Sequence, residues 1–121
     1  MSSRRSLLAV VLAASALAAC GFTLPTPKTG PHENEEPIPV PFPPPPARVE
    51  LIPKPPQKTA VWVDGAWEWK ARRWVWAPGQ WEVPEPGSYY APPITIRLAD
   101  GSLAYFPGAW KVSAGAATAK K

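Results

Sequence analysis

Residues 62 to 81 read WVDGAWEWKARRWVWAPGQW, and this stretch holds six of the seven tryptophans of a 121-residue chain. It contains two copies of the pattern aromatic-x-x-Gly-x-Trp, at 62–67 and 76–81. A third copy, YFPGAW, lies at 105–110, and a decayed copy is suggested near Tyr90. Aromatic residues that recur around turn dipeptides predict a module of short β-hairpins.

Each copy sets a turn dipeptide between two aromatic residues. Asp64-Gly65 is a strong signal for a two-residue hairpin turn, and the other two copies carry Pro-Gly at the same place. A trans-proline in Pro-Gly favours a type II turn, which suits a two-residue hairpin poorly, so wider or bulged turns remain an alternative there. The predicted pairs are Trp62 with Trp67 around Gly65, Trp76 with Trp81 around Gly79, and Tyr105 with Trp110 around Gly108.

The segment KARR at 70–73 is predicted to be a four-residue loop between the first two copies. It pairs Trp69 with Trp74 and, one step further, Trp67 with Trp76. Combined with the turns above, this register predicts one row of rings across four strands and a wetter reverse face. The row consists of Trp62, Trp67, Trp76 and Trp81, and the reverse face carries Val61, Glu68, Val75 and Glu82.

The second half of the module predicts another hairpin. Apolar and polar residues alternate over 94–98, and Asp100-Gly101 follows as a turn signal. In this register Leu98 faces Leu103 and Ile96 faces Tyr105. Two meanders with apolar faces predict a mainly β fold over about 59–112, a small antiparallel meander sandwich or a partly open barrel.

The first 21 residues resemble the export signal of bacterial lipoproteins. Two arginines precede an apolar run that is too short to cross a bilayer, and LAAC at 17–20 resembles a lipobox. The resemblance implies that residues 1–19 are a signal peptide and that Cys20 is acylated. A Gly at position 21, where an Asp is missing, implies the outer membrane in a Gram-negative host. Because Cys20 is the only cysteine, no intrachain disulfide is possible.

A proline-rich segment separates this signal from the tryptophan-rich module. There are 13 prolines in residues 25–56, which predicts an extended or disordered linker over 20–58 that acts as a spacer. The alternative is that PFPPPP at 41–46 docks into an aromatic groove, and the spacer is favoured. His32 is expected to be solvated rather than to bind a metal, and no cofactor is expected besides the lipid on Cys20. The tail at 113–121 is expected to be disordered.

Residues 61–82 resemble the YXWXGXW-repeat family of bacterial envelope proteins, and residues 105–110 match it in part. The family carries a leading Tyr where this chain has Val61, and the third copy is spaced further away. Members often follow a lipoprotein signal and a proline-rich segment. The resemblance implies an envelope location and a repeat architecture, and it supplies no catalytic residues because the family has no assigned activity.

The chain offers little for catalysis or for nucleic-acid binding. The single His and the single Cys lie outside the module, so no nucleophile with its base is available there. Glu68 and Glu82 remain a remote candidate pair for glycoside hydrolysis, although Val75 is expected to lie between them. Removal of residues 1–19 leaves 11 basic and 9 acidic side chains, a net charge of +2. We therefore expect no enzyme and no nucleic-acid partner.

Binding within the envelope is the function that the residues favour. Lys70, Arg72 and Arg73 could meet the anionic groups of an envelope polymer, although a solvated loop is the favoured interpretation. Trp69 and Trp74 lie beside them in the predicted sheet. Most rings are needed to bury a core in so short a module, so one or two at an edge are expected to be available. The partner would be a glycan or another envelope protein, on the periplasmic or the surface side of the outer membrane. The alternative is a purely structural module on a proline-rich stalk.

Overall fold

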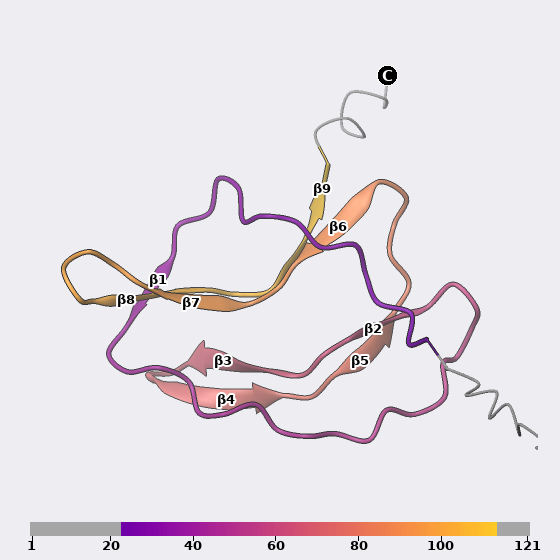
Figure 1. Ribbon diagram of the computed structural model, residues 1–121, viewed down its shortest axis with the longest axis horizontal. Helices are drawn as coiled ribbons and strands as arrows, with labels where there is room; N and C mark the ends of the chain where they lie inside the picture. Colours follow the sequence, from indigo (N-terminus) through magenta and orange to yellow (C-terminus); the bar gives the residue numbers. More distant parts are fainter. Residues whose placement is uncertain (1–22, 114–121) are drawn as a thin grey trace, which may run out of the picture.

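The computed structural model describes residues 23–113, which contain nine strands and no helix (Figure 1). The prediction of a mainly β fold is confirmed, and within this range no sheet closes into a barrel. The signal peptide, Cys20 and the tail after Ser113 lie outside the described residues. The strands are β1 (Ile38–Val40), β2 (Val61–Val63), β3 (Ala66–Lys70), β4 (Arg73–Ala77), β5 (Gln80–Glu82), β6 (Ser88–Ala91), β7 (Ile94–Arg97), β8 (Leu103–Phe106) and β9 (Ala109–Val112).

Strands β2 to β5 form one long hairpin over residues 61–82, which we call the tryptophan hairpin (Figure 1). β3 pairs with β4 and β2 pairs with β5, and the same antiparallel register holds in both pairs. This register sets Asp64-Gly65 directly opposite Pro78-Gly79. Each dipeptide therefore interrupts a strand at the same level as its partner, and neither reverses the chain.

The register confirms two predicted ring pairs and corrects two others. Trp69 pairs with Trp74 and Trp67 pairs with Trp76, as predicted from the loop at 70–73. Trp62 pairs with Trp81, so the predicted pairs of Trp62 with Trp67 and of Trp76 with Trp81 are wrong. The predicted row of rings across four strands is accordingly a ladder of three pairs, one between β2 and β5 and two between β3 and β4.

The repeat glycines admit aromatic rings from the facing strand. A Cβ atom on Gly79 would overlap the Trp62 ring and would lie 2.9 Å from both the Gly65 nitrogen and the Val63 carbonyl oxygen. A Cβ on Gly65 would lie 2.6 Å from Cζ2 of Trp76. The first tryptophan of each copy thus covers the glycine of the other copy. Close packing, and not a turn, explains the glycine in this pattern.

The tryptophan hairpin reverses at Ala71-Arg72. Both residues have positive φ, 49° and 63°, which is the conformation of a type I′ turn. The loop is two residues long where four were expected, because Lys70 pairs with Arg73. A loop shortened by one residue on each side keeps the register unchanged, and for this reason the nearby pairs were predicted correctly.

Strands β6 to β9 form a second hairpin over residues 88–112, which we call the tyrosine hairpin. It follows the same plan, with one register throughout and Pro92-Pro93 opposite Pro107-Gly108. Tyr90 pairs with Trp110 and Thr95 pairs with Tyr105, so the predicted pair of Tyr105 with Trp110 is wrong. Residues 90–95 therefore occupy the place of a decayed copy that faces 105–110.

The end loop of the tyrosine hairpin shifts the predicted register by one residue. Leu98 donates its N–H to the Ser102 carbonyl over 2.8 Å, and Gly101 has a φ of 89°, so three residues form the turn where two were expected. The predicted pairs of Leu98 with Leu103 and of Ile96 with Tyr105 are wrong, because Leu103 pairs with Arg97. This slip turns Ile96 to the face opposite Tyr105, where it is 37% exposed.

The proline-rich segment over residues 23–60, which we call the arm, lies against both hairpins (Figure 1). It is largely extended, as expected, and it differs from the detached spacer that the sequence predicts. Its strand β1 pairs with β8, which completes a three-stranded sheet in the order β1-β8-β7. The arm continues beneath β4 and β5 before it enters β2 (Figure 1).

The core lies where the two hairpins and the arm meet. Val40 from the arm, Trp74 from β4 and Tyr105 from β8 are buried together. The Trp74 and Tyr105 rings are perpendicular, with centroids 5.0 Å apart. The Tyr105 hydroxyl donates to the Trp67 carbonyl over 3.3 Å, which ties one hairpin to the other. Ile38, Trp67, Trp69 and Leu103 pack around this cluster.

Candidate functional site

Indole N–H groups bind the arm along the tryptophan hairpin. A proline has no N–H, so a proline-rich segment offers carbonyl acceptors, and an indole is a donor that has no acceptor of its own. The two are complementary in hydrogen bonding. Trp74 donates to the Phe42 carbonyl over 3.1 Å, Trp67 to Pro46 over 3.0 Å and Trp81 to Pro53 over 2.8 Å.

Glu50 supplies the remaining acceptor of this series. Its carboxylate accepts the Trp76 indole N–H over 2.7 Å and the Gly79 backbone N–H over 2.8 Å. Arg48, two residues earlier, lies over the Trp67 ring with 4.8 Å between its guanidinium carbon and the ring centroid. The arm therefore places one cation and one anion on the same ring pair, which is a strong combination for a partly buried contact.

The rings themselves meet edge to face. The centroids are 5.4 Å apart for Trp62 and Trp81, 5.3 Å for Trp67 and Trp76, and 5.2 Å for Trp69 and Trp74. This arrangement is favoured by the ring quadrupole. Trp62 and Trp74 are buried and the other four rings are half-buried, so most of the aromatic surface is used inside the fold.

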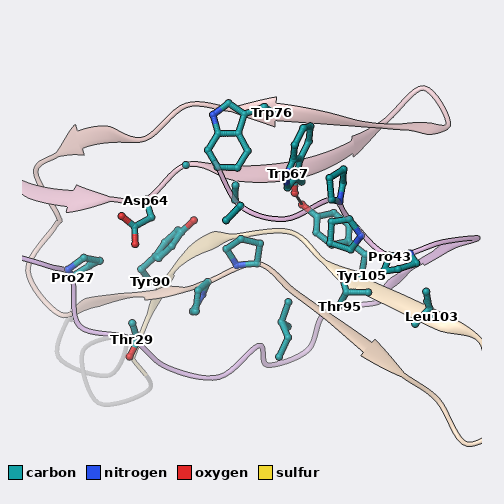
Figure 2. A pocket seen from close by; sticks show the side chains of 18 of the residues that line it. Pro27, Thr29, Pro43, Asp64, Trp67, Trp76, Tyr90, Thr95, Leu103 and Tyr105 are labelled. Carbon is teal, nitrogen blue, oxygen red and sulfur yellow. Dashed lines mark hydrogen bonds between the residues drawn. The ribbon is translucent and has the colours of Figure 1, made fainter. Parts of the chain in front are cut away.

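A cleft of about 970 Å³ lies between the two hairpins and is flanked by the arm (Figure 2). Trp67 and Trp76 border it from the tryptophan hairpin, and Tyr90 and Thr95 border it from the tyrosine hairpin. Pro43 to Pro45 line it on the arm side. The lining is mainly aromatic and aliphatic, with a few polar groups, as in sites for small ligands.

The polar groups of the cleft stay neutral or are already engaged. Burial raises the pKa of Tyr105 to about 12, and burial followed by the charges of Glu82, Glu68 and Asp64 raises the pKa of Tyr90. Both phenols are therefore protonated at neutral pH. Asp64 accepts the Trp62 indole N–H over 2.9 Å. Arg97 also borders the cleft, and its guanidinium donates to the Gly101 carbonyl over 2.8 Å. Because both charged side chains are already hydrogen-bonded within the protein, the cleft suits ligands that combine flat apolar faces with hydroxyl groups.

The residues predicted to bind from the end loop lie outside the cleft. Lys70 forms an ion pair of 2.7 Å with Glu68 and is exposed, as are Arg72 and Arg73. Trp69 and Trp74 pack on each other, on Phe42 and on Tyr105. The structure therefore separates the basic loop from the ring-lined cleft, and binding by the loop stays a prediction.

The register also separates the two candidate carboxylates. Glu68 pairs with Val75 and Glu82 pairs with Val61, so the predicted row in which Val75 lies between Glu68 and Glu82 is wrong. Glu82 accepts the Trp110 indole N–H over 2.6 Å and an amide N–H from Gln80. Glu68 borders a small cavity of about 100 Å³. Within residues 23–113, no group of three or more His, Cys, Asp or Glu side chains could hold a metal ion.

His32 lies in a polar cluster on the arm, whereas the sequence predicted that it would be solvated. Its Nε2 is 2.6 Å from the Pro92 carbonyl oxygen and its Nδ1 contacts the Glu35 carboxylate. Both partners are acceptors, so the imidazole donates to both only when it is doubly protonated. Lys111 forms a 2.8 Å ion pair with the same Glu35, and these two hydrogen bonds lower the Glu35 pKa.

Sequence reasoning missed the cleft because its walls come from distant segments. The available signal was the decayed copy near Tyr90, which predicts that the second half repeats the first.

Comparisons with protein-family models, with curated proteins and with solved structures give no match to this chain. In the part of the chain that the structure describes, no helix is long and apolar enough to cross a membrane.

Proposed function

We propose that the protein is a lipoprotein of the bacterial outer membrane, anchored through an acylated Cys20, whose β-module binds an envelope glycan and is not catalytic. The observation that carries the proposal is the ring-lined cleft between the hairpins. Trp67, Trp76 and Tyr90 border it, and their apolar surfaces suit the CH faces of sugar rings. Its neutral phenol and threonine hydroxyls suit sugar hydroxyls.

The location rests on the resemblance of LAAC at 17–20 to a lipobox and of residues 61–82 to the YXWXGXW repeats. Fatty-acid labelling of the wild type and of Cys20→Ala tests the anchor directly. Label on the wild type and none on the variant is expected. Equal labelling of the two would refute the anchor.

Retention on isolated peptidoglycan and on lipopolysaccharide tests glycan binding, with the mature chain carrying Cys20→Ser. Thr95→Trp would fill the cleft, and Val75→Trp adds the same side chain on an exposed position outside it. Retention that is lost in Thr95→Trp and kept in Val75→Trp supports the cleft. Loss in Arg72→Ala with Arg73→Ala instead would move the site to the end loop.

A structural role is the second candidate, and the use of the rings inside the fold favours it. Three ring pairs and four indole hydrogen bonds to the arm occupy most of the tryptophan surface among the described residues. In that case the module would be a purely structural element of the envelope and would bind no glycan. Absence of retention of the wild type on either polymer would favour this candidate over glycan binding.

A further inference from the structure

The arm joins the fold close to the proposed lipid anchor. The backbone N–H of Trp62 donates to the Pro25 carbonyl over 2.8 Å, so Pro25 is held beside the Trp62–Trp81 pair. Four residues separate Pro25 from Cys20 in the sequence. At most about 3.6 Å per residue, the two Cα atoms lie within about 18 Å of each other. A bilayer that holds a lipid on Cys20 must therefore lie near this end of the molecule.

A second part of the arm meets the fold at the same end. Trp81 donates its indole N–H to the Pro53 carbonyl over 2.8 Å, and the loop that follows leads into β2 (Figure 1). The turns of both hairpins lie at the opposite end of the long axis (Figure 1). The Trp62–Trp81 pair thus marks one end, and the segment from Leu51 to Lys58 is part of its surface.

This end carries exposed aliphatic side chains next to lysines. Leu51 is 97% exposed and Ile52 is 42% exposed, immediately before Pro53. Lys54 and Lys58 follow in the exposed loop. Val83, directly after β5, is 49% exposed. Aliphatic residues flanked by lysines suit a membrane interface, since the aliphatic groups leave water and the lysines are attracted to an anionic surface.

We infer that this end of the molecule rests on the bilayer that holds the Cys20 lipid. Leu51, Ile52 and Val83 contact the interface, and Lys54 and Lys58 meet anionic phospholipid headgroups. The inference rests on the lipid anchor proposed above. It replaces a module lifted away on a stalk by one that lies against the membrane, with the hairpin turns pointing away from it.

Site-specific quenching in vesicles tests the inference. The lipidated full-length protein is placed in vesicles that contain an anionic phospholipid and a nitroxide-labelled headgroup lipid. Leu51→Cys and Arg72→Cys each supply one free thiol for a fluorophore, because Cys20 is blocked by its lipid, and both positions are exposed. We expect several-fold stronger quenching at position 51 than at position 72.

The outcomes separate the resting geometry from the anchor. Equal and weak quenching at both positions, with the protein still sedimenting with the vesicles, would overturn the inference and leave the anchor intact. Protein that stays in the supernatant would overturn the anchor and the inference together. Lys54→Glu with Lys58→Glu should weaken quenching at position 51 without releasing the protein, and unchanged quenching would contradict the headgroup contact.

Discussion

The two hairpins share one register plan and hold the same arm in different ways. The tryptophan hairpin binds it mainly through indole N–H groups. The tyrosine hairpin binds it mainly through the backbone, by pairing β1 with β8 and by the bond from the Gly30 N–H to the Tyr90 carbonyl, 3.2 Å long. The arm explains the difference, because residues 41–46 include five prolines that cannot donate, whereas residues 28–30 have N–H groups. A proline-rich chain can thus be ordered by a surface that supplies the N–H donors that the prolines lack.

Gly79→Ala is the substitution with the largest expected effect on stability, and it tests the register that the two hairpins share. The new Cβ would press on backbone atoms of Gly65 and Val63 that cannot move separately, so we expect a loss of about 3 kcal/mol in unfolding free energy. Gly108→Ala, at the same level of the tyrosine hairpin, should cost less because the atoms it meets belong to the Tyr90 and Pro93 side chains.

Urea unfolding measures both substitutions, and Gly101→Ala is the control. The Gly101 site is open but has a positive φ, so a loss of about 1 kcal/mol from backbone strain is expected there. Equal losses at positions 79 and 101 would show that the repeat glycine is not a close-packing site.

Removal of the arm's carboxylate is expected to have the next largest effect. Glu50→Ala leaves the Trp76 indole N–H and the Gly79 N–H without their acceptor, which should cost about 2 kcal/mol. Glu50→Gln keeps one acceptor and should cost about half as much. On the tyrosine hairpin, Tyr89→Phe removes one neutral bond to the Pro31 carbonyl and should cost about 1 kcal/mol. A larger loss of unfolding free energy for Tyr89→Phe than for Glu50→Ala would show that the tyrosine hairpin, and not the tryptophan hairpin, has the stronger side-chain contact with the arm.

The end loops offer a stabilising change. Ala71 and Arg72 hold positive φ without being glycine, whereas the loop of the tyrosine hairpin has Gly101 at its positive φ. Ala71→Asn with Arg72→Gly should raise the unfolding free energy by about 1 kcal/mol, since this dipeptide is preferred in type I′ turns. The thermal midpoint measures the gain, and a lower midpoint would contradict the turn type.

The smallest expected effect is a pH dependence at Glu35, where the arm contacts Lys111 of the tyrosine hairpin. Hydrogen bonds from Lys111 and His32 lower the Glu35 pKa below its usual 4.5. A lowered pKa in the folded state stabilises the protein above that value, and the stabilisation is lost as the pH falls through the folded pKa. Urea midpoints from pH 6 downward should therefore fall less steeply in Glu35→Gln than in the wild type. Glu36→Gln controls for the loss of one negative charge. If the urea midpoints of the wild type and of Glu35→Gln fall in parallel with pH, Glu35 does not cause the pH dependence.

Whether a cross-strand pair can be predicted from the sequence depends on the turn from which its register is counted. Trp67 with Trp76 and Trp69 with Trp74 depend on the loop at 70–73 alone, and both were predicted correctly. The pair of Trp62 and Trp81 was missed because Asp64-Gly65 and Pro78-Gly79 each look like a turn when considered alone. The register places them opposite each other, and this relation is not local.

The arm and the cleft were beyond local reasoning for a related reason. A proline-rich segment has no periodicity and no ladder donors, so its own residues predict disorder. What orders it here is the supply of N–H donors on Trp67, Trp74, Trp76 and Trp81, whose direction follows from the hairpin register. The cleft in turn needs both hairpins and the arm in place, so only the composition of its lining was visible in the sequence.

The edge-to-face ladder has an optical consequence. Indoles with centroids 5.2 to 5.4 Å apart are close enough for their ultraviolet transitions to couple, which produces a pair of circular dichroism bands of opposite sign. These bands overlap the region where backbone signals are measured, so secondary-structure content derived from such a spectrum would be distorted. The same bands report on the ring pairs without any label, and their loss on titration would follow the separation of the rings directly.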